Sequence, residues 1–131
     1  MQFDLMQDNR LYIFSIDDVS PDGLRKFKEY LNSGNVPFRQ GVGSYEGEVE
    51  PCFVMEASAF LFHVFGSRFI KEQETVLYVF GQNRYTILKA MQDNEWETLV
   101  PGVLHEVDAS EINWYGNWTW LDGTFYSTKE L

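Results

Sequence analysis

Apolar residues along the N-terminal third of the chain recur first at the spacing of a strand and then at the spacing of a helix. Residues 11–16 form a compact, β-rich apolar run, which predicts a first strand. Ser20 suits the N-cap of a helix, and Pro21 suits its first position. The apolar residues that follow lie on one helical face: Leu24, Phe27, Tyr30 and Leu31. We therefore predict an amphipathic helix that ends at residues 32–35.

The middle of the chain predicts two more strands and a second helix. Residues 36–50 contain three glycines, so we expect a short bulged strand and a loop there. Residues 51–56 predict a strand. Between residues 58 and 70 apolar side chains cover nearly the whole circumference of a predicted helix, and such a helix is buried on both sides. In a domain this small, we expect the second cover to be another subunit.

The C-terminal half reads as a succession of extended segments. Residues 75–80 are the clearest strand, and Gly81-Gln82-Asn83 predicts a tight turn after it. Asp122-Gly123 is a second hairpin signal. Further extended segments are predicted at residues 85–88, 96–99 and 103–107.

The order of elements through residue 80 is strand, helix, strand, strand, helix, strand. That order is the ferredoxin-like split βαβ pattern. We expect an α+β fold with a mostly antiparallel, ferredoxin-like (PII-like) sheet, two helices and a C-terminal β-hairpin extension. With 131 residues, the chain is long enough for one hydrophobic core, so we expect a single domain over residues 1–131.

Composition and charge narrow the classes of function. Apolar residues make up 44% of the chain and aromatic residues 17%, which excludes disorder as the main state. The net charge of −10 argues against a nucleic-acid binder or a protein that docks on an acidic membrane surface. Three explanations of the charge remain: solubility, a cationic ligand, or mimicry of an acidic polymer.

Cysteine and histidine are scarce, which limits the chemistry available. One cysteine, Cys52, allows no internal disulfide, and His63 and His105 are far apart in the sequence. We therefore expect no metal site. No segment reaches the roughly 18 apolar residues of a membrane span, and the N-terminus lacks the basic start of a signal peptide. We expect a cytoplasmic protein.

A short acidic segment is the best candidate for a binding site. If it is extended, Glu46, Glu48 and Glu50 alternate and share one face. A solvated strand edge accounts for Glu46 and Glu48. Glu50 differs because it directly precedes an apolar strand, so its carboxylate is partly desolvated and suits a cationic substrate. The ring of Tyr45 could close over such a substrate.

Aromatic residues concentrate near the C-terminus: Trp114, Tyr115, Trp118 and Trp120. A cluster of this kind could serve as a platform for a sugar or a base. More often, however, such a cluster belongs to sheet packing or to an oligomer interface.

Three short segments carry an ordered set of motifs that spans residues 43–107, about half of the chain. Gly43-Ser44-Tyr45 comes first, followed by Glu50 just before a predicted core strand. Residues 72–78 then read Glu-Gln-Glu-Thr-Val-Leu-Tyr, and residues 100–107 read Val-Pro-Gly-Val-Leu-His-Glu-Val. This set resembles the phage-encoded S-adenosylmethionine lyases, which have a Gly-x-Tyr active-site loop, a Glu-Gln-acid-x-Val-Leu segment and a Pro-Gly-x-x-x-Glu-Val segment.

The resemblance implies a reaction and a set of site residues. The family splits S-adenosylmethionine into 5′-methylthioadenosine and homoserine lactone, which deprives host restriction-modification of its methyl donor. Glu50 and Tyr45 would be catalytic. Because the stretch between loop and glutamate is shorter here, Glu56 competes with Glu50. The resemblance and the lack of any charged nucleoside motif point to these substrate-binding residues: Gly43, Ser44, Glu56, Gln73, Glu74 and Val76.

The resemblance also implies an assembly. Family members resemble the PII signalling proteins and form homotrimers with active sites between subunits, without metal or cofactor. Two other functions stay open on the sequence alone. One is a non-enzymatic, acidic anti-restriction or anti-defence protein that mimics DNA. The other is a PII-like sensor of small molecules.

Overall fold

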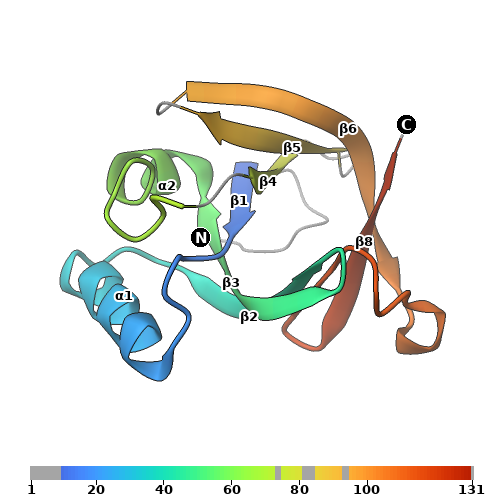
Figure 1. Ribbon diagram of the computed structural model, residues 1–131, viewed down its shortest axis with the longest axis horizontal. Helices are drawn as coiled ribbons and strands as arrows, with labels where there is room; N and C mark the ends of the chain where they lie inside the picture. The colour runs from blue at the N-terminus through green and yellow to red at the C-terminus, as the bar shows by residue number, and fades with distance from the viewer. Residues whose placement is uncertain (1–9, 73–74, 81–84, 93–94, 131) are drawn as a thin grey trace.

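Eight antiparallel strands close into a barrel in the computed structural model, which describes residues 10–72, 75–80, 85–92 and 95–130 (Figure 1). The elements in the N-terminal half are β1 (Arg10–Phe14), α1 (Pro21–Ser33), β2 (Arg39–Tyr45), β3 (Glu48–Glu56) and α2 (Ala57–His63). Those in the C-terminal half are β4 (Thr75–Phe80), β5 (Tyr85–Gln92), β6 (Glu95–Val107), the 3-10 turn η1 (Ala109–Glu111), β7 (Trp118–Leu121) and β8 (Thr124–Glu130).

The order of strands around the barrel is β1-β3-β2-β7-β8-β6-β5-β4, and β4 pairs again with β1. The expected α+β fold with an antiparallel sheet and two helices is confirmed. Since β3 is antiparallel to both β1 and β2, those two strands are parallel with β3 between them. By the same argument β3 and β4 are parallel, with β1 between them. The C-terminal segment adds four strands, β5 to β8, which include the extended segments expected at residues 85–88, 96–99 and 103–107, and these strands close the sheet.

Helix α1 forms as the sequence predicts. The Ser20 side chain accepts a hydrogen bond from the backbone N–H of Gly23 at 3.1 Å, and Pro21 is the first helical residue. Phe27 and Leu31 are fully buried on the inner face of the helix. An N-cap and an apolar face of this kind define a short helix with a fixed orientation.

Helix α2 is shorter than the predicted helix over residues 58–70. It spans Ala57–His63 and is followed by a turn in which Gly66 has a φ of 77°, a conformation that favours glycine. Residues beyond this turn fold back, and Ile70 is buried in the core. Phe62 is 82% exposed, so the outer face of α2 is not covered within the single chain, and its expected cover by another subunit stays a prediction.

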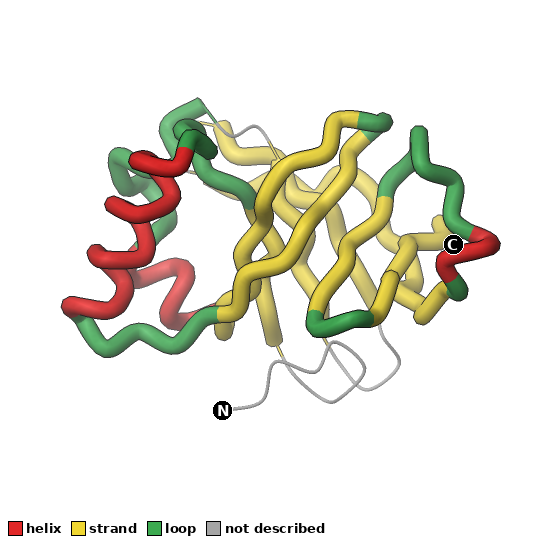
Figure 2. The backbone as a smooth tube through the Cα atoms, turned by 90° about the horizontal axis from the view of Figure 1, so that it is seen from below, coloured by secondary structure: helices red, strands yellow, loops and turns green. Residues whose placement is uncertain are grey.

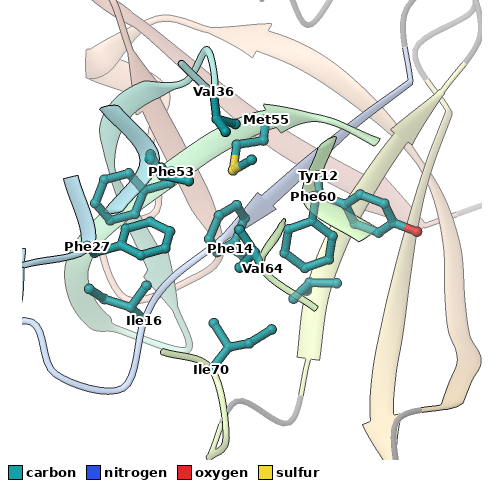
Figure 3. Packing of buried hydrophobic residues seen from close by; sticks show 12 residues of the cluster. Tyr12, Phe14, Ile16, Phe27, Val36, Phe53, Met55, Phe60, Val64 and Ile70 are labelled. Atoms are coloured by element: carbon teal, nitrogen blue, oxygen red, sulfur yellow. The ribbon is translucent and has the colours of Figure 1, made fainter. Parts of the chain in front are cut away.

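The hydrophobic core has two layers, one on each side of the barrel wall. Both helices pack on the outside of one part of the wall (Figure 2). Between the helices and the wall lies an aromatic-rich cluster that includes Tyr12, Phe14, Phe27, Phe53 and Phe60 (Figure 3). The barrel interior holds the second cluster: Leu11, Ile13, Cys52, Val54, Val79, Leu104, Leu121 and Tyr126. Side chains of β1 alternate between the two clusters, which explains why its sequence is continuously apolar.

Two hairpins have the same two-residue turn. In the β2–β3 hairpin Glu46 has a φ of 51° and Gly47 a φ of 88°; in the β7–β8 hairpin Asp122 has 49° and Gly123 has 89°. Positive φ at both positions is typical of type I′ turns. The Asp122-Gly123 hairpin is therefore confirmed, whereas the bulged strand and loop expected over residues 36–50 are wrong.

Two further expectations concern the turn after β4 and the absence of a membrane span. The predicted turn at Gly81-Gln82-Asn83 lies outside the described residues, although Phe80 of β4 faces Tyr85 of β5 across an antiparallel pair. In the described part of the chain, neither helix has the length and apolar character needed to cross a bilayer.

Candidate functional site

The barrel contains an open cavity of about 450 Å³. Its volume lies within the roughly 300–1,000 Å³ that is typical of small-molecule sites. Strands β1, β2, β3, β4, β6, β7 and β8 all contribute to the lining. The polar and aromatic residues that line it are Phe14, Ser15, Ser44, Tyr45, Glu48, Glu50, Cys52, Glu72, Asn117, Trp118, Thr119 and Tyr126.

A row of directly paired residues crosses four strands at the level of Glu50. Glu50 on β3 pairs with Gly43 on β2, Gly43 pairs with Thr119 on β7, and Thr119 pairs with Tyr126 on β8. Residues directly opposite one another in antiparallel strands point to the same face, and Tyr126 belongs to the interior cluster. The whole row therefore faces the cavity. Because Gly43 has no side chain, open space lies between Glu50 and Thr119.

The cavity is acidic. Glu48 and Glu50 are two residues apart on β3, so their side chains leave the same face about 7 Å apart. Glu72 adds a third carboxylate from the connection between α2 and β4. No lysine or arginine is among the described lining residues. Carboxylates with no opposing cation in a partly enclosed site produce a negative potential that attracts cations.

The expectation of three alternating carboxylates is corrected by the hairpin geometry. Glu46 is in the type I′ turn, where its φ is 51°, so it does not continue the alternation of β3. Its backbone N–H donates to Oδ1 of Asn117 at 2.7 Å. Only Glu48 and Glu50 share the inner face.

Cys52 forms part of the cavity wall next to Glu50. Burial is the main cause that raises the pKa of its thiol to about 12, and the charge of Glu50 adds to the shift. A hydrogen bond with the backbone of Gly41 acts in the opposite direction. The thiol is therefore protonated at neutral pH, and Cys52 serves as a small apolar wall and not as a nucleophile.

Tyr45 and Ser44 lie at the end of β2 next to the hairpin turn. Tyr45 is 49% exposed and lines the cavity, opposite Glu48. Ser44 is buried, and its hydroxyl donates to the carbonyl oxygen of Gly116 at 2.9 Å. The hydroxyl of Ser44 thus ties the hairpin to the segment before β7, and that role is structural.

The structure places Glu56 away from the cavity. Glu56 is six residues from Glu50, at the other end of β3, which corresponds to about 20 Å along the strand. It is the N-cap of α2 and accepts hydrogen bonds from the backbone N–H and the hydroxyl of Ser58. Those bonds lower the pKa of the Glu56 carboxyl. The expected competition with Glu50 for one site is therefore not seen in the geometry.

The other predicted site residues divide into two groups. Gly43 and Val76 line the cavity with Tyr45 and Glu50. Gln73 and Glu74 lie outside the described residues.

Thr119 and Tyr126 were not predicted from the sequence as cavity residues. The pairing of Thr119 with Tyr126 could have been predicted from the Asp122-Gly123 turn, because a two-residue turn places these residues opposite each other. Nothing local to the sequence indicates that Thr119 also faces Gly43.

Among the C-terminal aromatic residues Trp114, Tyr115, Trp118 and Trp120, Trp118 is the one that is buried, whereas Trp114 and Trp120 are 50% and 36% exposed. Trp118 is buried and contacts Trp114 and Phe125 edge to face, with ring centroids 5.5 and 5.6 Å apart. Its indole N–H donates to the carbonyl oxygen of Trp114 at 3.4 Å. Tyr115, by contrast, is 86% exposed. This arrangement favours the sheet-packing interpretation of Trp118, which also forms part of the cavity wall.

Within the described ranges, no three side chains of histidine, cysteine, aspartate or glutamate are grouped so that they could hold a metal ion. The chain matches no known family profile, and a search of curated proteins finds no significant match.

Proposed function

We propose that the protein binds S-adenosylmethionine in the barrel cavity and splits it into 5′-methylthioadenosine and homoserine lactone. The observation that carries the proposal is the acidic cavity, in which Glu50 and Tyr45 line the same space without an opposing cationic side chain in the described lining. S-adenosylmethionine carries a fixed positive charge on sulfur, so a negative or π-rich site is what would hold it. In a phage-infected cell this activity would remove the methyl donor of host restriction-modification.

The reaction needs little chemistry from the protein. The carboxylate of the substrate attacks its own γ-carbon, a carbon–oxygen bond forms, and the carbon–sulfur bond breaks. The electron pair of that bond moves to sulfur, which leaves as a neutral thioether. No proton has to be transferred. The protein's tasks are to fold the methionine part into a near-attack conformer and to exclude water.

Glu50 and Tyr45 divide these tasks. A carboxylate beside the sulfonium stabilises the bound substrate, but charge is lost from sulfur as the bond breaks, so uniform attraction would slow the chemical step. We therefore assign Glu50 to fixing the substrate geometry through the α-ammonium group or the ribose hydroxyls. Tyr45, at the mouth of the cavity, packs over the reacting chain and keeps water out.

We also propose that the subunit has a ferredoxin-like fold similar to that of the PII proteins. The two split βαβ units of β1 to β4 support a ferredoxin-like, PII-like subunit, elaborated here by β5 to β8.

We also propose that the subunit forms a homotrimer. The apolar side chains of α2 that face outward, Leu61 at 43% and Phe62 at 82% exposure, support association through this helix. The described cavity is lined by one chain, so the trimer is not needed to bring Tyr45 and Glu50 together. Light scattering at micromolar concentration should give three times the 15.3 kDa subunit mass, and Phe62→Ser should lower it. A stable monomer would contradict the trimer.

The activity has a direct test. The purified protein should convert S-adenosylmethionine into 5′-methylthioadenosine and homoserine lactone, both detected by mass spectrometry, and a chelator should leave the rate unchanged because the sulfonium is already activated. Binding without turnover would support the PII-like sensor. Inhibition of a restriction enzyme without binding of S-adenosylmethionine would support the DNA mimic.

Water labelled with oxygen-18 distinguishes the two possible nucleophiles. If the lactone forms first and then hydrolyses, the label enters the carboxyl group of homoserine. Direct attack of water on the γ-carbon would place the label in the hydroxyl group and would contradict the lactone mechanism.

A further inference from the structure

Thr119 is a buried polar residue of the cavity wall whose hydroxyl has no hydrogen-bond partner among the described residues. Its exposed fraction is 7%. The other buried polar residues of the described chain both have partners, since Ser15 donates to the carbonyl oxygen of Pro51 at 2.8 Å and Ser44 donates to that of Gly116. Buried hydroxyls are normally hydrogen-bonded because desolvation without a partner is unfavourable. The hydroxyl of Thr119 is therefore available to a ligand.

The position of Thr119 in the sheet sets the distance between the two ends of such a ligand. Thr119 and Glu50 flank Gly43 in the paired row, so their backbones are separated by two strand spacings, roughly 10 Å. Their side chains point into the cavity from either side of the glycine and narrow this gap. A ligand that lies over Gly43 therefore meets the carboxylate of Glu50 at one end and the neutral hydroxyl of Thr119 at the other.

We infer that Thr119 binds the α-carboxylate of a zwitterionic ligand whose cationic groups face Glu50; this inference rests on the proposed function. Glu48, Glu50 and Glu72 repel a carboxylate from their part of the cavity. A neutral donor is what stabilises a carboxylate there, and hydrogen bonds to charged groups are the stronger ones. With S-adenosylmethionine, this contact holds the attacking carboxylate while Glu50 holds the ammonium group.

Thr119→Val tests the inference because valine keeps the shape and the β-branching of threonine. Stability against urea should stay the same or rise, since no hydrogen bond within the described protein is lost. Affinity for sinefungin, an unreactive analogue with a carboxylate and a protonated amine at the place of the sulfonium, should fall about tenfold or more. Thr119→Ser, which retains the hydroxyl, should bind sinefungin much more tightly than the valine variant does.

Decarboxylated S-adenosylmethionine is the matched ligand, because it lacks the group that Thr119 is inferred to bind. Calorimetry should show the same affinity for wild type and Thr119→Val. An equal loss of affinity for both ligands would overturn the inference, and so would unchanged affinity for sinefungin or a clear loss of stability. If the wild type degrades S-adenosylmethionine in those cases, the proposed function stands without the role of Thr119. If the wild type binds neither ligand, both fail.

Discussion

Glu50→Gln is expected to fold and assemble like the wild type but to lose at least about two orders of magnitude in turnover. That loss corresponds to roughly 2.7 kcal/mol of transition-state stabilisation. Glutamine keeps the size of the side chain and removes the charge that orients the substrate. Glu50 faces the open space over Gly43, so the change leaves the surrounding packing intact. Single-turnover kinetics with S-adenosylmethionine would measure the chemical step separately from product release.

Two control variants make the result specific to Glu50. Glu56→Gln has the same chemistry on the same strand, but Glu56 caps α2 about 20 Å away, so turnover should stay near that of the wild type. Tyr45→Phe keeps the ring at the cavity mouth and should lose less than Glu50→Gln. Near-normal turnover in Glu50→Gln together with an inactive Glu56→Gln would move the catalytic role to Glu56. Normal turnover in both would remove the acidic residues from the mechanism.

Gly43→Val is expected to weaken ligand binding strongly and to reduce turnover while the barrel still forms. A Cβ at this position would lie 3.5 Å from Cβ of Cys52, an ordinary van der Waals contact. The two further methyl groups of valine would fill the space between Glu50 and Thr119. We expect a loss of at least about a hundredfold in affinity, since the ligand and the side chain would compete for the same volume. Calorimetry with sinefungin and circular dichroism would measure binding and fold separately.

The neighbouring glycine provides the contrast. A Cβ at Gly41 would clash with the backbone carbonyl of Trp120, so Gly41→Ala should destabilise the pairing of β2 with β7. Gly43→Ala adds one methyl group that fits and should reduce affinity far less than valine does. Full turnover in Gly43→Val would show that the substrate does not lie over Gly43.

The parts of the fold that the sequence predicts well are those with a local cause. The first strand and α1 follow from an apolar run, an N-cap at Ser20 and a helical apolar face. The second helix was predicted too long because apolar residues continue after Gly66, where the chain turns back into the core. The β2–β3 hairpin was missed because Gly41 and Gly43 are typical of loops. In the structure Gly41 allows a close approach to β7, and Gly43 leaves the cavity open.

The candidate site shows the same limit. The acidic segment and the resemblance pointed to Tyr45, Glu50 and Gly43, which the structure brings to one cavity. Thr119 was not predicted because its position depends on the pairing of β2 with β7, strands that are distant in the sequence. Barrel closure by β5 to β8 could not be predicted from local sequence either, because the hairpins of an open sheet and those of a closed barrel have the same sequence pattern.

Barrel closure also restricts how copies of this protein can associate. Every described strand pairs with a neighbour on each side over at least part of its length, and among the described pairs the longest stretch paired on one side alone is residues 95–101 of β6. Open sheets with exposed edges can extend from one molecule into the next, which leads to swapped dimers or fibrils. In the described part of the barrel no whole strand is left as such an edge, so recognition of a partner falls mainly to side chains. Outward-facing apolar residues such as Phe62 would therefore determine which assemblies form, and a single polar substitution there could keep the protein monomeric without opening the sheet.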